Sequence, residues 1–166
     1  MTAKKKVNNF SELYEATVSG DSLLSGFIKG HLVVEFLLVK IVEIGQPKLL
    51  DLADGLNHNR LIQLVYGLGH INDGQRDTLL LINQMRNKFA HQLTFTPTIQ
   101  EIEQVLLKAS NSFSDFTDGI SQGLDEIKGK KSINDCDEWV FPELFVQISY
   151  DLHSVYTDLG GHMEDF

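Results

Sequence analysis

The sequence predicts an all-α protein, a single-domain bundle of five or six principal helices. Apolar residues recur three and four positions apart through most of the chain, and capping residues, glycines and prolines separate the periodic segments. No segment alternates apolar and polar residues for long enough to indicate a β-strand. The 166 residues, of which 42% are hydrophobic, are enough for one domain that buries its own core.

The first expected helix is short and covers residues 10–18. Asp21 or Ser22 then caps a longer helix, whose apolar positions continue at helical spacing to about Ile44. Gly45 follows as a C-cap glycine, with a proline two positions later that prevents the helix from continuing. These residues therefore predict one long amphipathic helix early in the chain.

The central segment, residues 60–93, is expected to form two amphipathic helices around a glycine-marked turn. A short helical connector over residues 48–56 precedes it. The first central helix has an apolar face made of Leu61, Leu64, Val65 and Leu68. Asn72 or Asp73 caps the second helix. Its apolar face repeats the helical spacing with Leu79, Ile82, Met85 and Phe89.

The C-terminal half begins with a predicted capping box, formed by Thr98 and Glu101. Behind it apolar residues step by threes and fours as far as Ile127. This spacing predicts one long helix of about thirty residues, bent near Gly119 or Gly123.

The last expected helix follows a polar loop over residues 129–137. Pro142 stands at a first helical position, and Gly160 stops the helix. The resulting division of the chain is a flexible basic arm, a single all-α domain and a C-terminal tail, at residues 1–8, 9–160 and 161–166.

Composition limits the classes of function. The net charge of −9 argues against a broad phosphate-binding surface, which requires clustered lysines and arginines. A single cysteine, Cys136, excludes an intrachain disulfide and is typical of a reducing compartment. No apolar run approaches the roughly 20 residues of a membrane span, and the lysines near the N-terminus are not followed by a signal-peptide core. We therefore expect a cytoplasmic protein without a membrane partner.

The strongest candidate for chemistry is the end of the second central helix, where Arg86, Asn87 and His91 occur together. Arginine supplies a permanent cation with a planar fork that matches phosphate. Histidine transfers protons near neutral pH, and an asparagine amide orients a hydroxyl group or a phosphate oxygen. These groups suffice to cleave RNA without a metal or cofactor, because His91 can move the proton while Arg86 stabilises the charged phosphorane.

Helix geometry adds a condition to this hypothesis. Asn87 and His91 share a face of an ideal helix, whereas Arg86 and His91 lie about 140° apart. A complete site requires the helix end to distort or two copies of the motif to meet across a two-fold interface. We therefore expect a homodimer.

The pattern Arg86-Asn87-x3-His91 at the end of a helix resembles the HEPN superfamily, the higher-eukaryote and prokaryote nucleotide-binding domain. Its active members are all-α, metal-independent endoribonucleases of toxin or defence systems. The resemblance implies that Arg86, Asn87 and His91 form the catalytic set in a cleft between two protomers. It also implies RNA as substrate and an antitoxin as partner. Toxins controlled by adenylylation commonly carry a tyrosine where this chain has Leu93, so control of that kind is not expected.

A second resemblance, to the mannitol-operon repressor-like (MltR) family, covers about residues 26–93, including the segment LIQLVYGLGHIN. That family is all-helical and has no obvious DNA-reading element. It implies a non-enzymatic regulator that acts through protein contacts, without sequence-specific DNA binding. An inactive RNA- or nucleotide-binding relative is a third interpretation.

Other polar residues favour structural interpretations. His31 and Glu35 are one helical turn apart, as metal ligands can be, but no second pair at recognisable spacing accompanies them. The sequence therefore favours an ordinary helix histidine and predicts no metal site. Four further histidines do not cluster in the sequence and are expected at the surface or in loops: His58, His70, His153 and His162.

Overall fold

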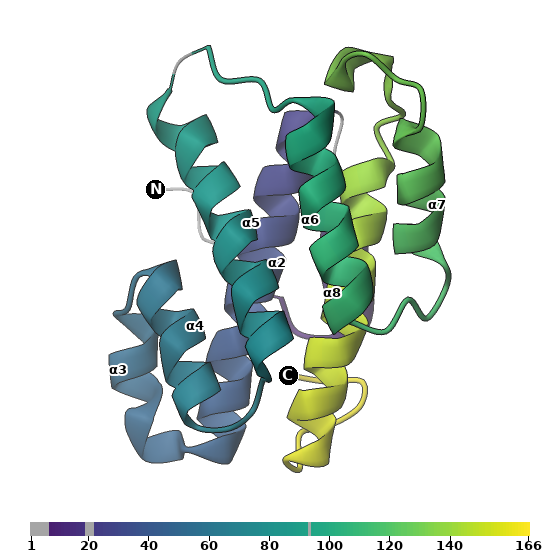
Figure 1. The fold of residues 1–166 in the computed structure, drawn as a ribbon. Helices are drawn as coiled ribbons and strands as arrows, with labels where there is room; N and C mark the ends of the chain where they lie inside the picture. The colour runs from purple at the N-terminus through teal and green to yellow at the C-terminus, as the bar shows by residue number, and fades with distance from the viewer. Residues whose placement is uncertain (1–6, 19–21, 93) are drawn as a thin grey trace, which may run out of the picture.

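The computed structural model describes residues 7–18, 22–92 and 94–166, which form an all-helical bundle (Figure 1). Eight α-helices and two short 3-10 helices lie in this part of the chain, and none of them is long and apolar enough to cross a bilayer. The predicted all-α class is confirmed for these residues. In chain order the helices are α1 (Phe10–Val18), α2 (Leu23–Gly45), η1 (Pro47–Leu49), α3 (Leu50–Asp54), α4 (His58–Gly67), α5 (Asp73–His91), α6 (Ile99–Ser112), α7 (Gly119–Ile127), η2 (Ile133–Asp135) and α8 (Val140–Asp158).

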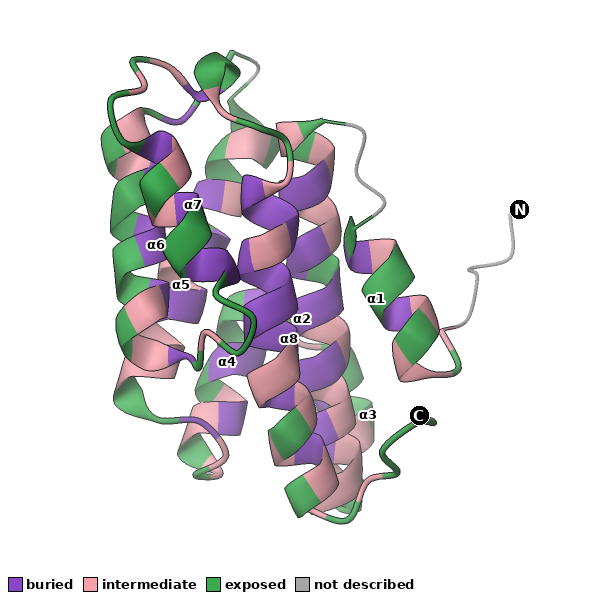
Figure 2. Ribbon diagram, turned by 90° about the vertical axis from the view of Figure 1, so that its right-hand side faces the viewer, coloured by how far each residue is buried: buried purple, intermediate pink, exposed green. Residues whose placement is uncertain are grey.

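The bundle is organised around α2 and α8, which lie side by side and have the most extensive contact between two helices. Gly30 of α2 allows this approach, because a Cβ atom at that position would lie 2.0 Å from Cδ2 of Phe145 on α8. Phe27 and Phe145 are fully buried, with ring centroids 5.3 Å apart in an edge-to-face arrangement. Figure 2 shows buried residues concentrated along this central pair.

The remaining helices cover the central pair from several sides. α5, α6 and α7 follow one another around it, with α7 against α8, and α1 packs on both α2 and α8. The short α3 contacts α2 near its C-terminal end, and α4 packs against α2 and α5. This arrangement brings α2, α4 and α5 into mutual contact, and the candidate site lies among them.

Three predicted helix starts are confirmed by side-chain caps. Ser22 accepts a hydrogen bond from the backbone N–H three residues later, at the start of α2. Asn72 forms a capping box at the start of α5, and Thr98 forms another with Glu101 at the start of α6. The alternative cap of α2, Asp21, lies outside the described residues.

The single long helix predicted to follow Thr98 is wrong. The structure contains two helices instead, α6 and α7, separated by residues 113–118. The carboxylate of Asp115 accepts hydrogen bonds, both of 2.8 Å, from the backbone N–H groups of Ile120 and Ser121 in the first turn of α7. Short polar side chains compete in this way for backbone groups that a continuous helix would use. The chain therefore stops and restarts where a bend was expected.

Gly45 ends α2 as predicted, but not as a left-handed C-cap glycine. The cap position is Gln46, with a φ of −143°. The side chains of His70 and Leu159 instead pack closely against Gly45. A Cβ atom there would lie 2.9 Å from Nε2 of His70 and 3.2 Å from Cδ1 of Leu159. The absence of a side chain thus serves packing against neighbouring segments.

The two ends of the described chain lie against each other. Asn9 and Asp165 form an isolated antiparallel bridge. The ring of Phe166 packs edge-to-face on Phe36 of α2, with centroids 5.0 Å apart. The C-terminal residues therefore contact the bundle. Residues 1–6 of the predicted basic arm lie outside the described part of the chain.

Candidate functional site

α5 carries the predicted catalytic set, and its construction fixes where that set lies. The helix runs for 19 residues to His91, and Gln92 at its C-cap has extended backbone with φ −121° and ψ 106°. Arg86 and Asn87 therefore lie in the last turns of α5, and His91 is its final residue. Leu93 lies outside the described residues.

A polar cleft of about 460 Å³ lies where α2, α4 and α5 meet, and Arg86 and Asn87 form part of its wall. Apart from Leu56, all the residues that line it are polar or charged. The full lining consists of His31, Glu35, Leu56, Asn57, His58, Asn59, Asn83, Arg86 and Asn87. The cleft thus combines a guanidinium group, a carboxylate, two imidazoles and several amides.

His91 does not line this cleft. It is exposed at the end of α5, one turn beyond Asn87. Arg86 is half-buried, and its Nη1 donates a hydrogen bond of 3.4 Å to Oδ1 of Asn87. The structure therefore brings two of the three predicted site residues together and leaves the third outside, as expected from the angle of about 140° between Arg86 and His91 on a regular helix.

The inner wall of the cleft holds a cluster of two histidines and a carboxylate. Nδ1 of His58 lies 3.1 Å from Oε2 of Glu35, and Nε2 of His31 lies 3.4 Å from Oδ1 of Asn83. The rings of His31 and His58 face each other, with centroids 3.9 Å apart and planes inclined by 40°. Three helices contribute to this contact, because His31 and Glu35 lie on α2, His58 on α4 and Asn83 on α5.

Burial sets the charges in the cluster. His31 is 3% exposed, and this burial, together with the neighbouring His58 ring, lowers its pKa from 6.5 to about 4. The hydrogen bond from His58 lowers the pKa of Glu35. Near neutral pH the cluster therefore contains a neutral His31 imidazole and a Glu35 carboxylate, in the same cleft as the Arg86 cation.

His58 keeps one ring nitrogen without a partner. Its Nε2 atom is buried and has no hydrogen-bond partner in the described residues. In the neutral tautomer that donates Nδ1–H to the Glu35 carboxylate, Nε2 carries a lone pair. Leaving a buried polar atom unpaired costs about 1–3 kcal/mol, so a group that engaged this lone pair would stabilise the fold.

The prediction that His58 lies at the surface or in a loop is wrong. The residue is 7% exposed and occupies the first position of α4. Asn57 caps that helix, its side chain accepting the backbone N–H of Arg60, and this turn directs His58 toward α2. The signals in the sequence were the His31 and Glu35 pair and the cap before His58, but only the packing of α4 on α2 joins them.

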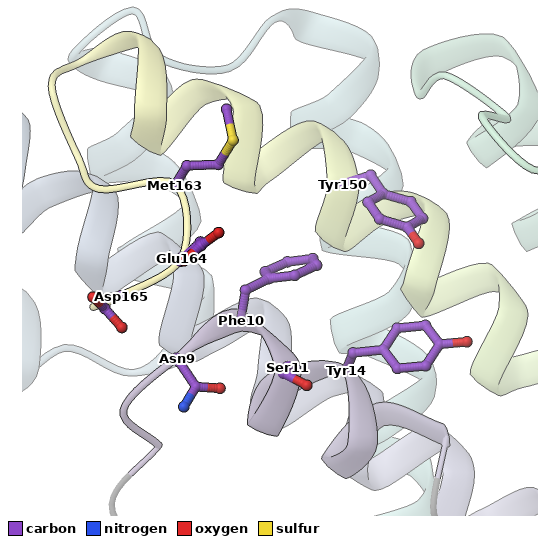
Figure 3. A pocket seen from close by; sticks show the side chains of 8 residues that line it. All are labelled: Asn9, Phe10, Ser11, Tyr14, Tyr150, Met163, Glu164 and Asp165. Atoms are coloured by element: carbon purple, nitrogen blue, oxygen red, sulfur yellow. The ribbon is translucent and has the colours of Figure 1, made fainter.

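A larger cavity, of about 670 Å³, lies away from the predicted site, between α1, α8 and the C-terminal residues. Figure 3 shows Phe10 projecting into it among Tyr14, Tyr150 and Met163. The charged residues in its wall are both carboxylates, so it does not suit a phosphate-bearing ligand. The polar cleft is therefore the stronger candidate for chemistry.

Comparison of the chain with known protein families, with curated proteins and with solved structures finds no match. The resemblances to the HEPN and MltR families accordingly rest on the residues quoted above.

Proposed function

We propose that this protein is a metal-independent endoribonuclease of the HEPN type, whose site combines Arg86, Asn87 and His91. The observation that carries the proposal is the position of Arg86 and Asn87 in the wall of a polar cleft. A half-buried guanidinium in such a cleft can bind a phosphate with two parallel hydrogen bonds. The neighbouring amide can orient one of its oxygens.

The reaction is an internal transfer of the phosphodiester. His91 takes the proton of the ribose 2′-OH, and the 2′ oxygen attacks the adjacent phosphorus. A P–O2′ bond forms, the P–O5′ bond breaks, and the leaving 5′ oxygen takes a proton from water, while His91 afterwards releases its proton to the solvent. The products are a 2′,3′-cyclic phosphate and a 5′-hydroxyl end. Arg86 stabilises the charge on the phosphorane oxygens during this step.

The proposed site is shared between two copies of the chain. His91 is exposed and outside the cleft that contains Arg86 of its own chain. A two-fold pairing through the ends of α5 would bring His91 of one copy to Arg86 of the other, since each copy presents the same surface. In that arrangement the angular separation on one helix no longer prevents the two groups from acting on one phosphate.

RNA cleavage in the presence of EDTA tests the proposal. The wild-type protein should cleave a structured RNA and leave 2′,3′-cyclic phosphate ends, whereas Arg86→Ala and His91→Ala should each be inactive. The matched control is His162→Ala, because His162 is also an exposed histidine but lies near the C-terminus. Cleavage by both site variants would refute the proposal, and absence of cleavage by the wild type would favour the MltR-like regulator that acts through protein contacts.

Mixing the two inactive variants tests the shared site. Each heterodimer of an Arg86→Ala chain and a His91→Ala chain contains one site in which both side chains are intact. Cleavage should therefore return when the two proteins are mixed under conditions that allow exchange of subunits. If each chain used its own Arg86 and His91, the mixture would stay inactive.

A further inference from the structure

We propose that His31, Glu35 and His58 bind one divalent transition-metal ion of the zinc class at the inner wall of the cleft. This inference goes beyond the proposed ribonuclease activity and does not depend on it, because the ligand set includes neither Arg86 nor His91. The ion would be held by two imidazole nitrogens and one carboxylate oxygen, with a fourth position left for water or an oxyanion.

The geometry of the three side chains carries the proposal. Each residue offers one ligand atom, and these three atoms all lie within 4.8 Å of one another. Tetrahedral bonds to zinc of about 2.1 Å hold ligand atoms roughly 3.4 Å apart, so the widest pair needs to close by no more than about 1.4 Å. His31 and Glu35 are one turn apart on α2, the spacing at which two helix side chains can reach the same ion.

The buried nitrogen of His58 is the second, independent observation. The His58 side chain is 6% exposed, and its Nε2 atom is buried without a hydrogen-bond partner in the described residues. The hydrogen bond with Glu35 gives a partner to Nδ1 of His58 but not to Nε2. Because Glu35 is itself a proposed ligand, metal binding replaces the hydrogen bond between His58 and Glu35, whose atoms Nδ1 and Oε2 already lie 3.1 Å apart, close to the separation of neighbouring ligand atoms.

The chemistry of the donors selects the class of ion. Two imidazoles and one carboxylate suit zinc, and also cobalt or nickel, better than magnesium or calcium, which prefer oxygen ligands. A set of three protein ligands is typical of sites with an open coordination position. Arg86 and Asn87 line the same cleft, so an oxyanion bound at that position would find a cation and an amide nearby.

Metal titration of the EDTA-stripped protein tests the inference without RNA. One equivalent of Co²⁺ should give the intense visible absorption of a tetrahedral site, and added Zn²⁺ should displace the Co²⁺ and remove this absorption. Zn²⁺ should also raise the melting temperature of the protein by several degrees. Glu35→Gln and His58→Ala should abolish the cobalt absorption. The matched controls are Glu43→Gln, on the same helix but paired with Lys40, and His162→Ala; both should bind as the wild type does.

Glu35→Gln is the decisive variant, because glutamine retains an acceptor for the hydrogen bond from His58 and removes only the anionic ligand. Its circular dichroism should match that of the wild type. Absence of cobalt absorption in the wild type, or equal absorption in Glu35→Gln, would overturn the inference. Absence of RNA cleavage by a wild-type protein that binds cobalt would instead count against the ribonuclease proposal alone.

Discussion

Nδ1 of His58 lies 3.1 Å from Oε2 of Glu35, although the two residues are 23 positions apart and belong to different helices. This contact joins α4 to α2 in the wall of the cleft that contains Arg86. It also leaves the second nitrogen of His58 buried and unpaired within the described residues. This polar pair thus links the packing of α2 on α4 to the chemistry of the candidate site.

Glu35→Ala should destabilise the metal-free protein by about 1–3 kcal/mol, because the buried Nδ1–H of His58 would lose its acceptor. Urea denaturation of the EDTA-treated protein near neutral pH measures this loss. Glu43→Ala is the control: Glu43 is as exposed as Glu35, but its partner Lys40 is more exposed than His58, so this pair should contribute less than about 1 kcal/mol. Equal losses in the two variants would show that the burial of His58 adds nothing to the stability contributed by its pair with Glu35.

Gly30→Ala should destabilise the fold by about 1–3 kcal/mol or more, because the new methyl group would overlap the ring of Phe145. Phe145 is fully buried at the centre of the bundle and has little room to move. Thermal and urea unfolding measure the effect. Gly67→Ala is the matched control: it is also a helical glycine, but a Cβ atom there meets nothing within 4 Å. Similar effects of the two substitutions would contradict the close approach of α2 and α8.

Glu101→Gln should show a pH-dependent loss of stability. Oε1 of Glu101 accepts a hydrogen bond of 2.7 Å from Nζ of Lys88, and Oε2 accepts the backbone N–H of Thr98. These bonds, that from Lys88 first, lower the pKa of Glu101 below 4.5. Because the folded-state pKa lies below the unfolded value, the stabilisation is present above about pH 4.5 and is lost as the pH falls through the folded pKa.

The expected loss in Glu101→Gln is below about 1 kcal/mol near neutral pH, since the pair is partly exposed. It should shrink further in acid, because the protonated glutamic acid no longer attracts Lys88. Urea denaturation across this pH range provides the measurement, with Glu103→Gln, an exposed position on the same helix, as control. A difference from wild type that stayed constant with pH would exclude the ionic contribution.

The parts of the fold that the sequence predicts are those controlled by neighbouring residues. Ser22, Asn72 and Thr98 cap helices through side chains that bond backbone groups three positions away, so their roles are visible in a short segment. The sequence pattern does not predict the break after α6, because Phe116 continues the helical spacing of apolar residues. In the structure it is 78% exposed and lies between two helices. Spacing alone does not distinguish a buried position from an exposed one.

The candidate site likewise contains residues that the sequence predicts and residues that only the tertiary structure brings together. Arg86 and Asn87 were found from the sequence because they are adjacent on one helix, and the structure brings both to the cleft. The cluster that includes His58 was missed, since the residue lies 27 positions after His31 and meets it only through the packing of α4 on α2. Tertiary contacts of this kind leave no periodic signal in a single sequence.

Arg86→Lys should reduce RNA cleavage about 10²–10³-fold, as removal of a group that stabilises the transition state does. Lysine keeps the positive charge but lacks the planar fork that binds two phosphate oxygens at once, so charge alone should not restore activity. The measurement is the single-turnover cleavage rate with saturating protein in EDTA. Arg76→Lys is the control, since Arg76 lies on the same helix near its start, where it pairs with Asp73 and Asp77 outside the cleft. If Arg86→Lys cleaved RNA as fast as Arg76→Lys, Arg86 would contribute only its charge, and the bidentate phosphate contact would have to be abandoned.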